Sequence, residues 1–357
     1  MQDSPAAKSE AYNVVVVGGG YFANFHINAW RRLEGANLVA IVEQDSSKHT
    51  VLKEKLSNLN SADILITDSL SDVLSTNTVD IVDIATPPSS HTALITEAVA
   101  RRCPYVICQK PFCGTYNAAS DVYSKTKSST STIIVHENFR FQPWYRAIKS
   151  ELEQESIGSV LQANFRLRPG DGQGSDAYLE RQPYFREMDN FLIHETGVHY
   201  IDVFRYLFGE PASLSAELQR LNPAIAGEDS GHFIFYYDNG LRVHFDGNRL
   251  LDHAAVNPRL TMGEMLIEGT EGSLALYGNG DLLHRKSGEK TSYAINYPFK
   301  DNDFGGDCVY YTQQHVISHI RDGTPLENRI DEYLRNLELE ALVYKAAASQ
   351  SRLECPL

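Results

Sequence analysis

The 357-residue sequence lacks the features that mark several classes of protein. Its five cysteines are odd in number and form no C-x-x-C pair, so we expect neither a disulfide framework nor a structural zinc site. No apolar run approaches the roughly 18 residues that a membrane span needs. Basic residues are in deficit, and the net charge of −14 argues against non-specific binding of nucleic acid. These absences favour a globular protein of a reducing compartment, with the cytoplasm as the default and neither a membrane nor a nucleic acid as partner.

The beginning of the chain offers no targeting signal. Residues 1–10 are small and polar and contain no apolar stretch of the kind that signal peptides carry. We therefore expect residues 1–11 to form a disordered tail. The remaining length is enough for two domains.

A glycine-rich turn after a run of valines is the most informative stretch. Residues 14–17 are all valine, as in a short strand buried on both faces of a parallel sheet. Gly18, Gly20 and Ala23 then form the pattern G-x-G-x-x-A: the first allows a tight turn, the second lets the backbone approach a pyrophosphate, and the third keeps the following helix close. The alternative is a strand, turn and helix that bind no nucleotide. The residues expected to bind the cofactor at this turn are Gly18, Gly20, Tyr21, Phe22 and Ala23.

An acidic residue at the end of the next apolar run indicates which dinucleotide binds. The run at 38–42 ends at Glu43, where a carboxylate would hydrogen-bond the ribose hydroxyls of the adenosine. The same carboxylate would repel a 2′-phosphate, and Gln44, Asp45 and Ser46 supply no arginine to hold one. NAD is therefore favoured over NADP.

The pattern of apolar segments predicts two different sheets. From residue 12 to about 137, short apolar runs alternate with amphipathic segments, which is typical of an α/β domain with a doubly wound parallel sheet. After residue 160, strand-like runs follow one another without intervening helices, and Asp238-Asn239-Gly240 is a strong hairpin signal. This indicates a second, α+β domain with an antiparallel sheet. The predicted division is a nucleotide-binding domain at 12–138, a substrate-binding and oligomerisation domain at 139–330, and a C-terminal helix at 331–357 that packs back on the first domain.

Several motifs at the ends of the predicted strands occur in a fixed order. After G-x-G-x-x-A come A-T-P-P-S-S-H at 85–91, Q-K-P at 109–111, N-F-R-F at 138–141 and G-V-H-Y-I-D at 197–202. Together they resemble the Gfo/Idh/MocA oxidoreductases, over nearly the whole chain. The resemblance implies a Rossmann domain, a second domain with a large, mostly antiparallel open sheet, and dimers or tetramers formed through that sheet. It also implies a small-molecule substrate such as a sugar or polyol.

Lys110 is the first candidate for the chemistry. It follows a buried strand at the carboxyl end of the sheet, where a partly desolvated lysine can donate to a substrate hydroxyl. The alternative from position alone is a solvated surface lysine. The resemblance favours the catalytic role, although Gln109 stands where the family usually has a glutamate, which removes a charge beside Lys110.

A second candidate pair lies in the stretch 192–199. A helix is predicted to start here and to run to Phe208, with Gly209 as its C-cap. Glu195 and His199 are four residues apart, about 40° around an α-helix, and so share a face. The resemblance implies that His199 is the general base and that Glu195, where the family has aspartate, orients it or binds substrate. The alternative is an ion pair on a helix surface.

A zinc site in the same stretch is disfavoured. His194 and His199 are five residues apart, about 140° around a helix, whereas H-E-x-x-H needs a spacing of four. We therefore expect His194 to contact substrate or to be buried.

A glycine-rich loop before this stretch supplies polar side chains and an aromatic platform. Arg168 and Tyr184 are the residues expected to contact a sugar-like ligand, while most of their neighbours fit an exposed loop. The loop and the stretch 191–199 resemble D-apiose dehydrogenase-type members of the family.

The other cofactor contacts follow the family resemblance. His91 matches a position near the cofactor, as does His26, and Asn138 lies where the family lines the nicotinamide pocket; capping or structural roles are the alternatives. The expected cofactor contacts beyond the turn are Glu43, Thr86, Pro87, His91, Gln109, Lys110 and Asn138.

The sequence thus predicts an NAD-dependent dehydrogenase of a sugar or cyclic polyol, with D-apiose or a related aldose as one candidate. His199, Lys110 and Glu195 carry the chemistry, and no metal is expected. A non-catalytic NAD-binding sensor on the same scaffold is the alternative, and a reductase running in the opposite direction would use the same residues.

Overall fold

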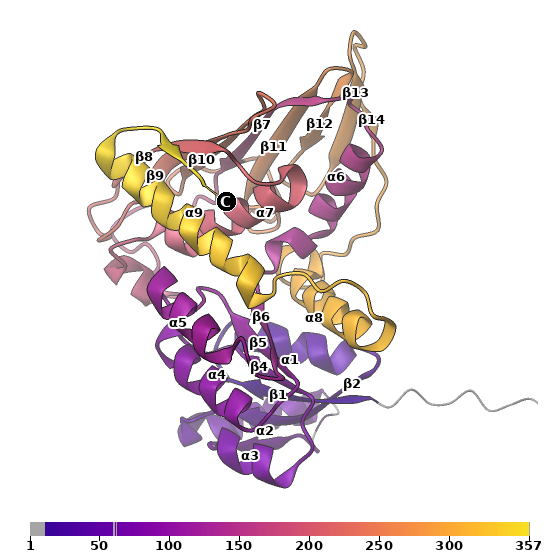
Figure 1. Ribbon diagram of the computed structural model, residues 1–357, viewed down its shortest axis with the longest axis vertical. Helices are drawn as coiled ribbons and strands as arrows, with labels where there is room; N and C mark the ends of the chain where they lie inside the picture. The colour runs from indigo at the N-terminus through magenta and orange to yellow at the C-terminus, as the bar shows by residue number, and fades with distance from the viewer. Residues whose placement is uncertain (1–10, 60, 62, 357) are drawn as a thin grey trace, which may run out of the picture. The chain divides into compact units, whose positions relative to one another are not determined.

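A computed structural model describes residues 11–59, 61 and 63–356 (Figure 1). The tail expected at 1–11 lies outside these residues except for Ala11. The chain divides into two compact units: unit 1 holds the chain up to Glu137 together with Val309–Leu334, and unit 2 holds Asn138–Cys308 together with Arg335–Leu357. Within the described part of the chain, no helix combines the length and the apolar character needed to cross a bilayer.

Unit 1 is built on a six-stranded parallel sheet, as the sequence predicts. The strand order is β3-β2-β1-β4-β5-β6, so the order reverses between β1 and β4, the place where ligands bind in folds of this kind. The strands are β1 (Tyr12–Val17), β2 (Ala36–Val42), β3 (Leu65–Thr67), β4 (Ile81–Ile84), β5 (Tyr105–Gln109) and β6 (Thr132–His136). The helices between them are α1 (Ala23–Arg32), α2 (His49–Asn58), α3 (Leu70–Thr76), α4 (His91–Ala100) and α5 (Tyr116–Thr126).

Burial explains why the central strands of unit 1 are apolar. The valines of β1 are at most 4% exposed, and every residue of β4 is fully buried. Helix α8 (Phe304–Asp322) adds Val316 and Ile317 to this core. Residues 309–334 therefore belong with unit 1, whereas the sequence led us to expect residues 139–330 as one continuous domain.

Unit 2 carries a nine-stranded, mostly antiparallel sheet. Its order is β14-β13-β12-β11-β7-β10-β9-β8-β15. The pair β7–β10 is parallel, an arrangement that needs a long connection such as the one that separates these two strands in sequence. The predicted hairpin at 238–240 joins β9 to β10, with Gly240 at φ +85°. The strands are β7 (Val160–Leu167), β8 (Ser213–Gln219), β9 (Ser230–Tyr236), β10 (Arg242–Asn248), β11 (Gly263–Gly269), β12 (Gly272–Leu276), β13 (Leu282–Lys286), β14 (Tyr293–Ala294) and β15 (Leu353–Glu354).

Three helices contribute to the core of unit 2. They are α6 (Pro143–Glu153), α7 (Val198–Phe208) and the later part of α9 (Ile330–Ser349), whose buried Leu339, Val343 and Ala346 join the core formed on the sheet (Figure 1). From Arg335 onward this last helix therefore packs in unit 2, whereas the sequence led us to expect residues 331–357 on the first domain.

Candidate active site

The glycine turn of unit 1 lies between β1 and α1 and has the geometry of a dinucleotide site. Gly18 has φ +117°, and a Cβ on it would lie 2.6 Å from the carbonyl oxygen of Ala85, so only glycine fits there. No atom of the described residues lies within 4 Å of the position that a Cβ on Gly20 would take. The backbone at Gly20 is therefore open to a close approach, beside the N-terminus of α1 that Ala23 begins.

Glu43 lies directly beside this turn. Its Oε2 accepts a hydrogen bond from the Gly19 amide at 2.9 Å, and its Oε1 accepts one from the Asp45 amide at 3.0 Å. Lys48, which the sequence analysis did not consider, reaches both acids, 3.8 Å from Glu43 and 3.7 Å from Asp45. The turn and the Glu43 carboxylate thus lie side by side.

Thr86, Pro87 and His91 form the end of β4 and the turn after it. The buried His91 donates from Nε2 to the Thr86 carbonyl at 2.8 Å, and the Thr86 hydroxyl hydrogen-bonds Ser90 at 2.7 Å. Burial lowers the pKa of His91, partly offset by that bond to the Thr86 carbonyl. His91 therefore fixes the shape of the turn as a neutral imidazole.

Lys110 is held through Gln109 by a chain of buried polar groups in unit 1. The Lys110 amide donates to Gln109 Oε1 at 2.6 Å, and Gln109 Nε2 lies 3.2 Å from His26 Nε2. The other ring nitrogen of His26, Nδ1, lies 2.8 Å from an oxygen of the fully buried Asp83, which also accepts from Trp30 Nε1 at 2.6 Å. A chain of hydrogen bonds thus joins the backbone amide of Lys110 to the buried carboxylate of Asp83.

The two ends of this chain fix the direction of its bonds. An ionised carboxylate only accepts, so His26 donates to Asp83 from Nδ1. The Lys110 amide only donates, so Gln109 turns its carbonyl to Lys110 and its amide nitrogen to His26 Nε2, which accepts. Burial alone would raise the pKa of Asp83, but the hydrogen bonds that it accepts from His26 and Trp30 hold it below the ordinary value. Asp83 was not among the residues predicted from the sequence, although a lone acid among apolar strand residues is a signal that could have identified it.

In unit 2, Glu195 and His199 lie on either side of a change in helix type. The segment Leu192–Gly197 winds as a π-helix and α7 begins at Val198, so the angle of 40° expected for an α-helix does not describe the pair. Glu195 accepts from the Thr196 hydroxyl at 2.8 Å. His199 is 4% exposed and stacks flat on Phe139, with the ring centres 3.8 Å apart. The predicted C-cap at Gly209 is confirmed, since its φ is +83° and its amide bonds to Arg205.

His194 is turned toward α9. Its Nδ1 lies 2.6 Å from Glu340, and its backbone amide donates to the Tyr344 hydroxyl at 3.1 Å. That hydroxyl in turn donates to Glu228 at 2.7 Å, and Glu228 accepts from two further amides of the region, those of Phe191 and Ile193. These bonds anchor the π-helical segment within unit 2.

Arg168 and Tyr184 differ sharply in their surroundings. Arg168 is buried, and its guanidinium forms an ion pair with Asp246 and donates to the Asp246 carbonyl at 2.7 Å. Tyr184 is 56% exposed and accepts from Gln182 at 3.2 Å. Partial desolvation and the nearby charge of Glu195 raise the pKa of its phenol. The charge of Glu195 thus acts on the phenol of Tyr184, whereas the guanidinium of Arg168 binds Asp246 of β10.

Asn138 opens unit 2 and is 2% exposed, and its carbonyl accepts from Phe141 in a short turn. Lys110 belongs to unit 1, whereas Glu195 and His199 belong to unit 2. Among the residues that the structure describes, no group of three or more His, Cys, Asp or Glu side chains could hold a metal ion.

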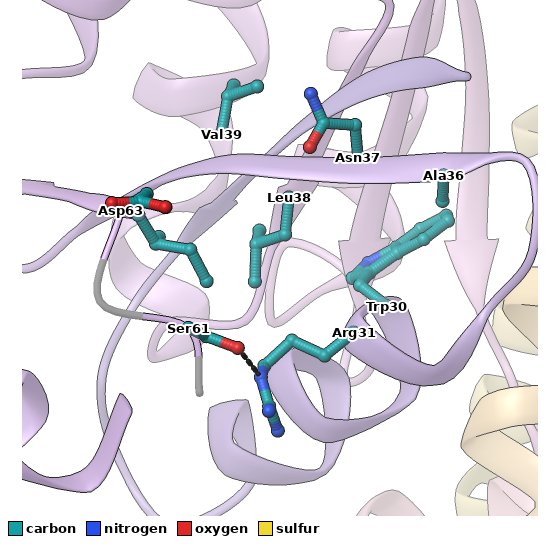
Figure 2. A pocket seen from close by; sticks show the side chains of 9 residues that line it. Trp30, Arg31, Ala36, Asn37, Leu38, Val39, Ser61 and Asp63 are labelled. Carbon is teal, nitrogen blue, oxygen red and sulfur yellow. Dashed lines mark hydrogen bonds between the residues drawn. The ribbon is translucent and has the colours of Figure 1, made fainter. Parts of the chain in front are cut away.

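One surface pocket of unit 1, of about 400 Å³, contains none of the residues predicted to bind cofactor or substrate (Figure 2). Arg31 lies along it and donates to the Ser61 hydroxyl at 2.7 Å. The lining residues are Trp30, Arg31, Ala36, Asn37, Leu38, Val39, Ser61, Asp63 and Ile64.

Comparisons with known proteins agree with this picture. A family model described as "Oxidoreductase family, NAD-binding Rossmann fold" matches residues 12–137, and one described as "GFO/IDH/MocA C-terminal domain" matches residues 145–275. D-apiose dehydrogenase of Paraburkholderia graminis is 29% identical over 95% of this chain and 88% of its own, and that of Rhizobium rhizogenes is 28% identical over 94% of each. An oxidoreductase from Agrobacterium radiobacter, solved with NAD+, L-tartaric acid and magnesium, is 25% identical with a TM-score of 0.84, covering 96% of this chain and 98% of that one. The chain therefore belongs to the Gfo/Idh/MocA family and is an NAD-binding oxidoreductase.

Proposed function

We propose that this protein is an NAD-dependent dehydrogenase that oxidises a hydroxyl-bearing carbon of a neutral sugar or cyclic polyol, with D-apiose or a related aldose as the first candidate. The observation that carries the substrate class is the similarity to D-apiose dehydrogenases over 95% of this chain. In this proposal unit 1 holds the cofactor through the glycine turn, Glu43 and the ends of β4 and β5. Unit 2 supplies the substrate contacts, among them Tyr184 and Glu195.

Lys110 and His199 divide the proton chemistry between them. The Lys110 ammonium donates a hydrogen bond to the substrate oxygen, which stabilises negative charge on it as the hydroxyl proton leaves. The His199 imidazole accepts that proton, since an imidazole is a side-chain base suited to work near neutral pH. NAD, when bound, supplies the acceptor for the hydride from the substrate carbon. Glu195 orients His199 or binds a further hydroxyl.

The remaining expectations form part of the same proposal. We propose a homodimer or homotetramer joined through the sheet of unit 2, on which Leu161 and Leu266 are 54% and 42% exposed. We also propose a reducing compartment such as the cytoplasm, since all five cysteines are free thiols.

NADH fluorescence of the purified protein with NAD and a panel of aldoses, inositols and apiose tests the proposal. Turnover should fall roughly 10²- to 10⁴-fold in Lys110→Met and His199→Asn, with NAD binding retained. Lys125→Met is the matched control, because Lys125 lies on the surface and pairs across one turn of α5 with Asp121. Full activity in either site variant would overturn the mechanism, and tight NAD binding without turnover across the panel would favour the sensor.

A further inference from the structure

Arg249, which follows β10 and is 1% exposed, is the largest charged side chain that is fully buried in the described part of unit 2. Its guanidinium forms a two-pronged ion pair with Asp171: Nε lies 3.1 Å from Oδ1 and Nη2 lies 2.7 Å from Oδ2. Burial alone would raise the pKa of Asp171, but the charge of Arg249 and its hydrogen bonds lower it. Both partners therefore stay ionised inside the unit.

Aromatic rings surround the same guanidinium. Its central carbon lies 4.7 Å from the ring centre of Phe191, 5.3 Å from that of Tyr178 and 5.5 Å from that of Phe185. The three rings also contact one another, with centres 5.0 to 5.4 Å apart. A cation over aromatic faces is favourable, but an apolar side chain of similar volume would also fill this space. Packing alone does not explain why the residue is an arginine.

The backbone fixes the loop that carries Asp171 onto Arg249. The Gly172 amide donates to the Arg249 carbonyl at 2.9 Å, and the Gly170 amide donates to the Leu251 carbonyl at 2.9 Å. A Cβ on Gly172 would lie 2.8 Å from the Tyr178 hydroxyl and 3.0 Å from the Cβ of Arg249. The guanidinium is therefore held in one orientation from the loop side.

That orientation directs the third nitrogen of Arg249 toward the candidate site. Nη1 donates to the Thr196 hydroxyl oxygen at 2.9 Å and lies 3.8 Å from Glu195 Oε2. A guanidinium has no acceptor, so the hydroxyl receives this bond on its oxygen and must give its own proton elsewhere. The Glu195 carboxylate lies 2.8 Å from that oxygen and accepts the proton.

We infer that Arg249 is a positioning residue, which sets the direction of the Thr196 hydroxyl and thereby holds one carboxylate oxygen of Glu195 in place. The inference rests on the proposed function only for the consequence that Glu195 contributes to turnover. The placement of its carboxylate is a separate, structural claim. Neither Arg249 nor Thr196 touches substrate in this account; both act through Glu195.

Two substitutions at Thr196 distinguish the effect of its hydroxyl from the effect of its size. Thr196→Val keeps the shape of the side chain but removes the hydroxyl proton that Glu195 accepts, whereas Thr196→Ser keeps that proton. Crystal structures of the full chain should show the Glu195 carboxylate in a different rotamer in Thr196→Val and in the original one in Thr196→Ser. An unmoved carboxylate in Thr196→Val would overturn the inference. If Thr196→Val does not fold, Thr196→Ala against Thr196→Ser makes the same comparison.

Kinetics of the same variants test whether the effect passes through Glu195. Turnover should fall about ten- to a hundredfold in Thr196→Val, the loss of one hydrogen bond to a charged group, and should return in Thr196→Ser. In a Glu195→Gln background the valine substitution should change turnover less than about twofold, because the carboxylate is already absent. If Thr196→Val lowers turnover as much in the Glu195→Gln background as in the wild type, Thr196 does not act through the Glu195 carboxylate, and the inference would be overturned.

One result separates this inference from the proposed function. If the carboxylate moves in Thr196→Val but Glu195→Gln retains full turnover, the Thr196 hydroxyl that Arg249 contacts holds Glu195 in place as inferred, and the catalytic role given to Glu195 has failed.

Discussion

In each unit of this protein, hydrogen bonds connect a buried charged side chain to a candidate catalytic residue, and the two charges have opposite sign. In unit 1 the acceptor-only carboxylate of Asp83 directs hydrogen bonds through His26 and Gln109 to the Lys110 backbone. In unit 2 the donor-only guanidinium of Arg249 directs one through Thr196 to Glu195. Because neither group can reverse its role, each fixes the direction of the hydrogen bond that it makes with the next group of its chain. The comparison shows that a buried charge of either sign can set the direction of such a chain.

The two charges differ in how fully they are satisfied. Asp83 gathers its donors on one oxygen, Oδ2, which accepts from His26, from Trp30 and from Gln313 of α8 at 3.2 Å. Its Oδ1 has no hydrogen-bond partner among the described residues. Arg249 instead bonds through all three of its nitrogens and lies against three rings. We therefore expect the loss of Arg249 to cost more stability than the loss of the charge on Asp83.

Arg249→Met should show the largest effect. It leaves Asp171 buried with longer contacts to Arg181 at 3.4 Å and Tyr178 at 3.3 Å, and we expect a loss of about 3 kcal/mol in the free energy of unfolding. Urea unfolding of the full chain measures it. The control is the double variant Asp171→Leu/Arg249→Met, which removes both charges and should recover most of that stability. A double variant as unstable as the single one would mean that the aromatic contacts, not the charge pair, dominate.

Asp83→Asn should show the second largest effect on stability. The amide keeps the shape but turns charge-assisted bonds from His26 and Trp30 into neutral ones, so we expect a loss of roughly 2 kcal/mol in the same assay. Asp80→Asn is a matched control, because Asp80 lies just before the same strand and accepts a backbone bond from Asn13 at 2.8 Å. Equal losses in the two variants would contradict the special place given to Asp83.

The two hydrogen-bond chains show which features of this molecule a local sequence pattern can predict and which it cannot. The glycine turn, Glu43, the strand ends and the hairpin at 238–240 depend on neighbours in sequence, and local patterns therefore identified them. Asp83 and Arg249 depend on partners up to 230 residues away, such as Gln313 for Asp83, and no local pattern joins such positions. Arg168 was expected at the substrate because of its loop, but its partner Asp246 lies 78 residues further on. The π-helical turn at 192–197 likewise follows from anchors at Glu228 and α9 rather than from its own residues.

Low pH should lower the free energy of unfolding, because the pKa values of the buried Asp83 in unit 1 and Asp171 in unit 2 both lie below their ordinary value. A carboxyl group with a lowered folded-state pKa contributes stability that is complete above its unfolded pKa, about 4, and is lost as the pH falls through the folded value. Unfolding free energies measured from pH 5 down to pH 2 should therefore fall less steeply in Asp83→Asn and in Asp171→Asn. The slope should decrease by up to about 1.4 kcal/mol per pH unit for each carboxyl removed. Asp121→Asn, on the exposed face of α5, serves as the control, and a slope unchanged from wild type in both buried variants would contradict the prediction.

Gln109→Glu should have the smallest effect on stability, but it tests most directly which groups donate and which accept in the hydrogen-bond chain of unit 1. A carboxylate at this position cannot donate to His26 Nε2, 3.2 Å away in the wild type, so the ring must take a proton there or lose the contact. We expect His26 to become an imidazolium between two carboxylates, that of Asp83 and the one introduced by the substitution, at a cost of about 1 kcal/mol in unfolding free energy. The ¹⁵N spectrum of labelled histidine reports it: one protonated ring nitrogen in the wild type and two in Gln109→Glu. Gln109→Met removes the amide without adding charge and should leave His26 with the single proton that Asp83 holds. A neutral His26 in Gln109→Glu would mean that the ring gives up its contact with residue 109 instead of taking a second proton, and the expected imidazolium would be wrong.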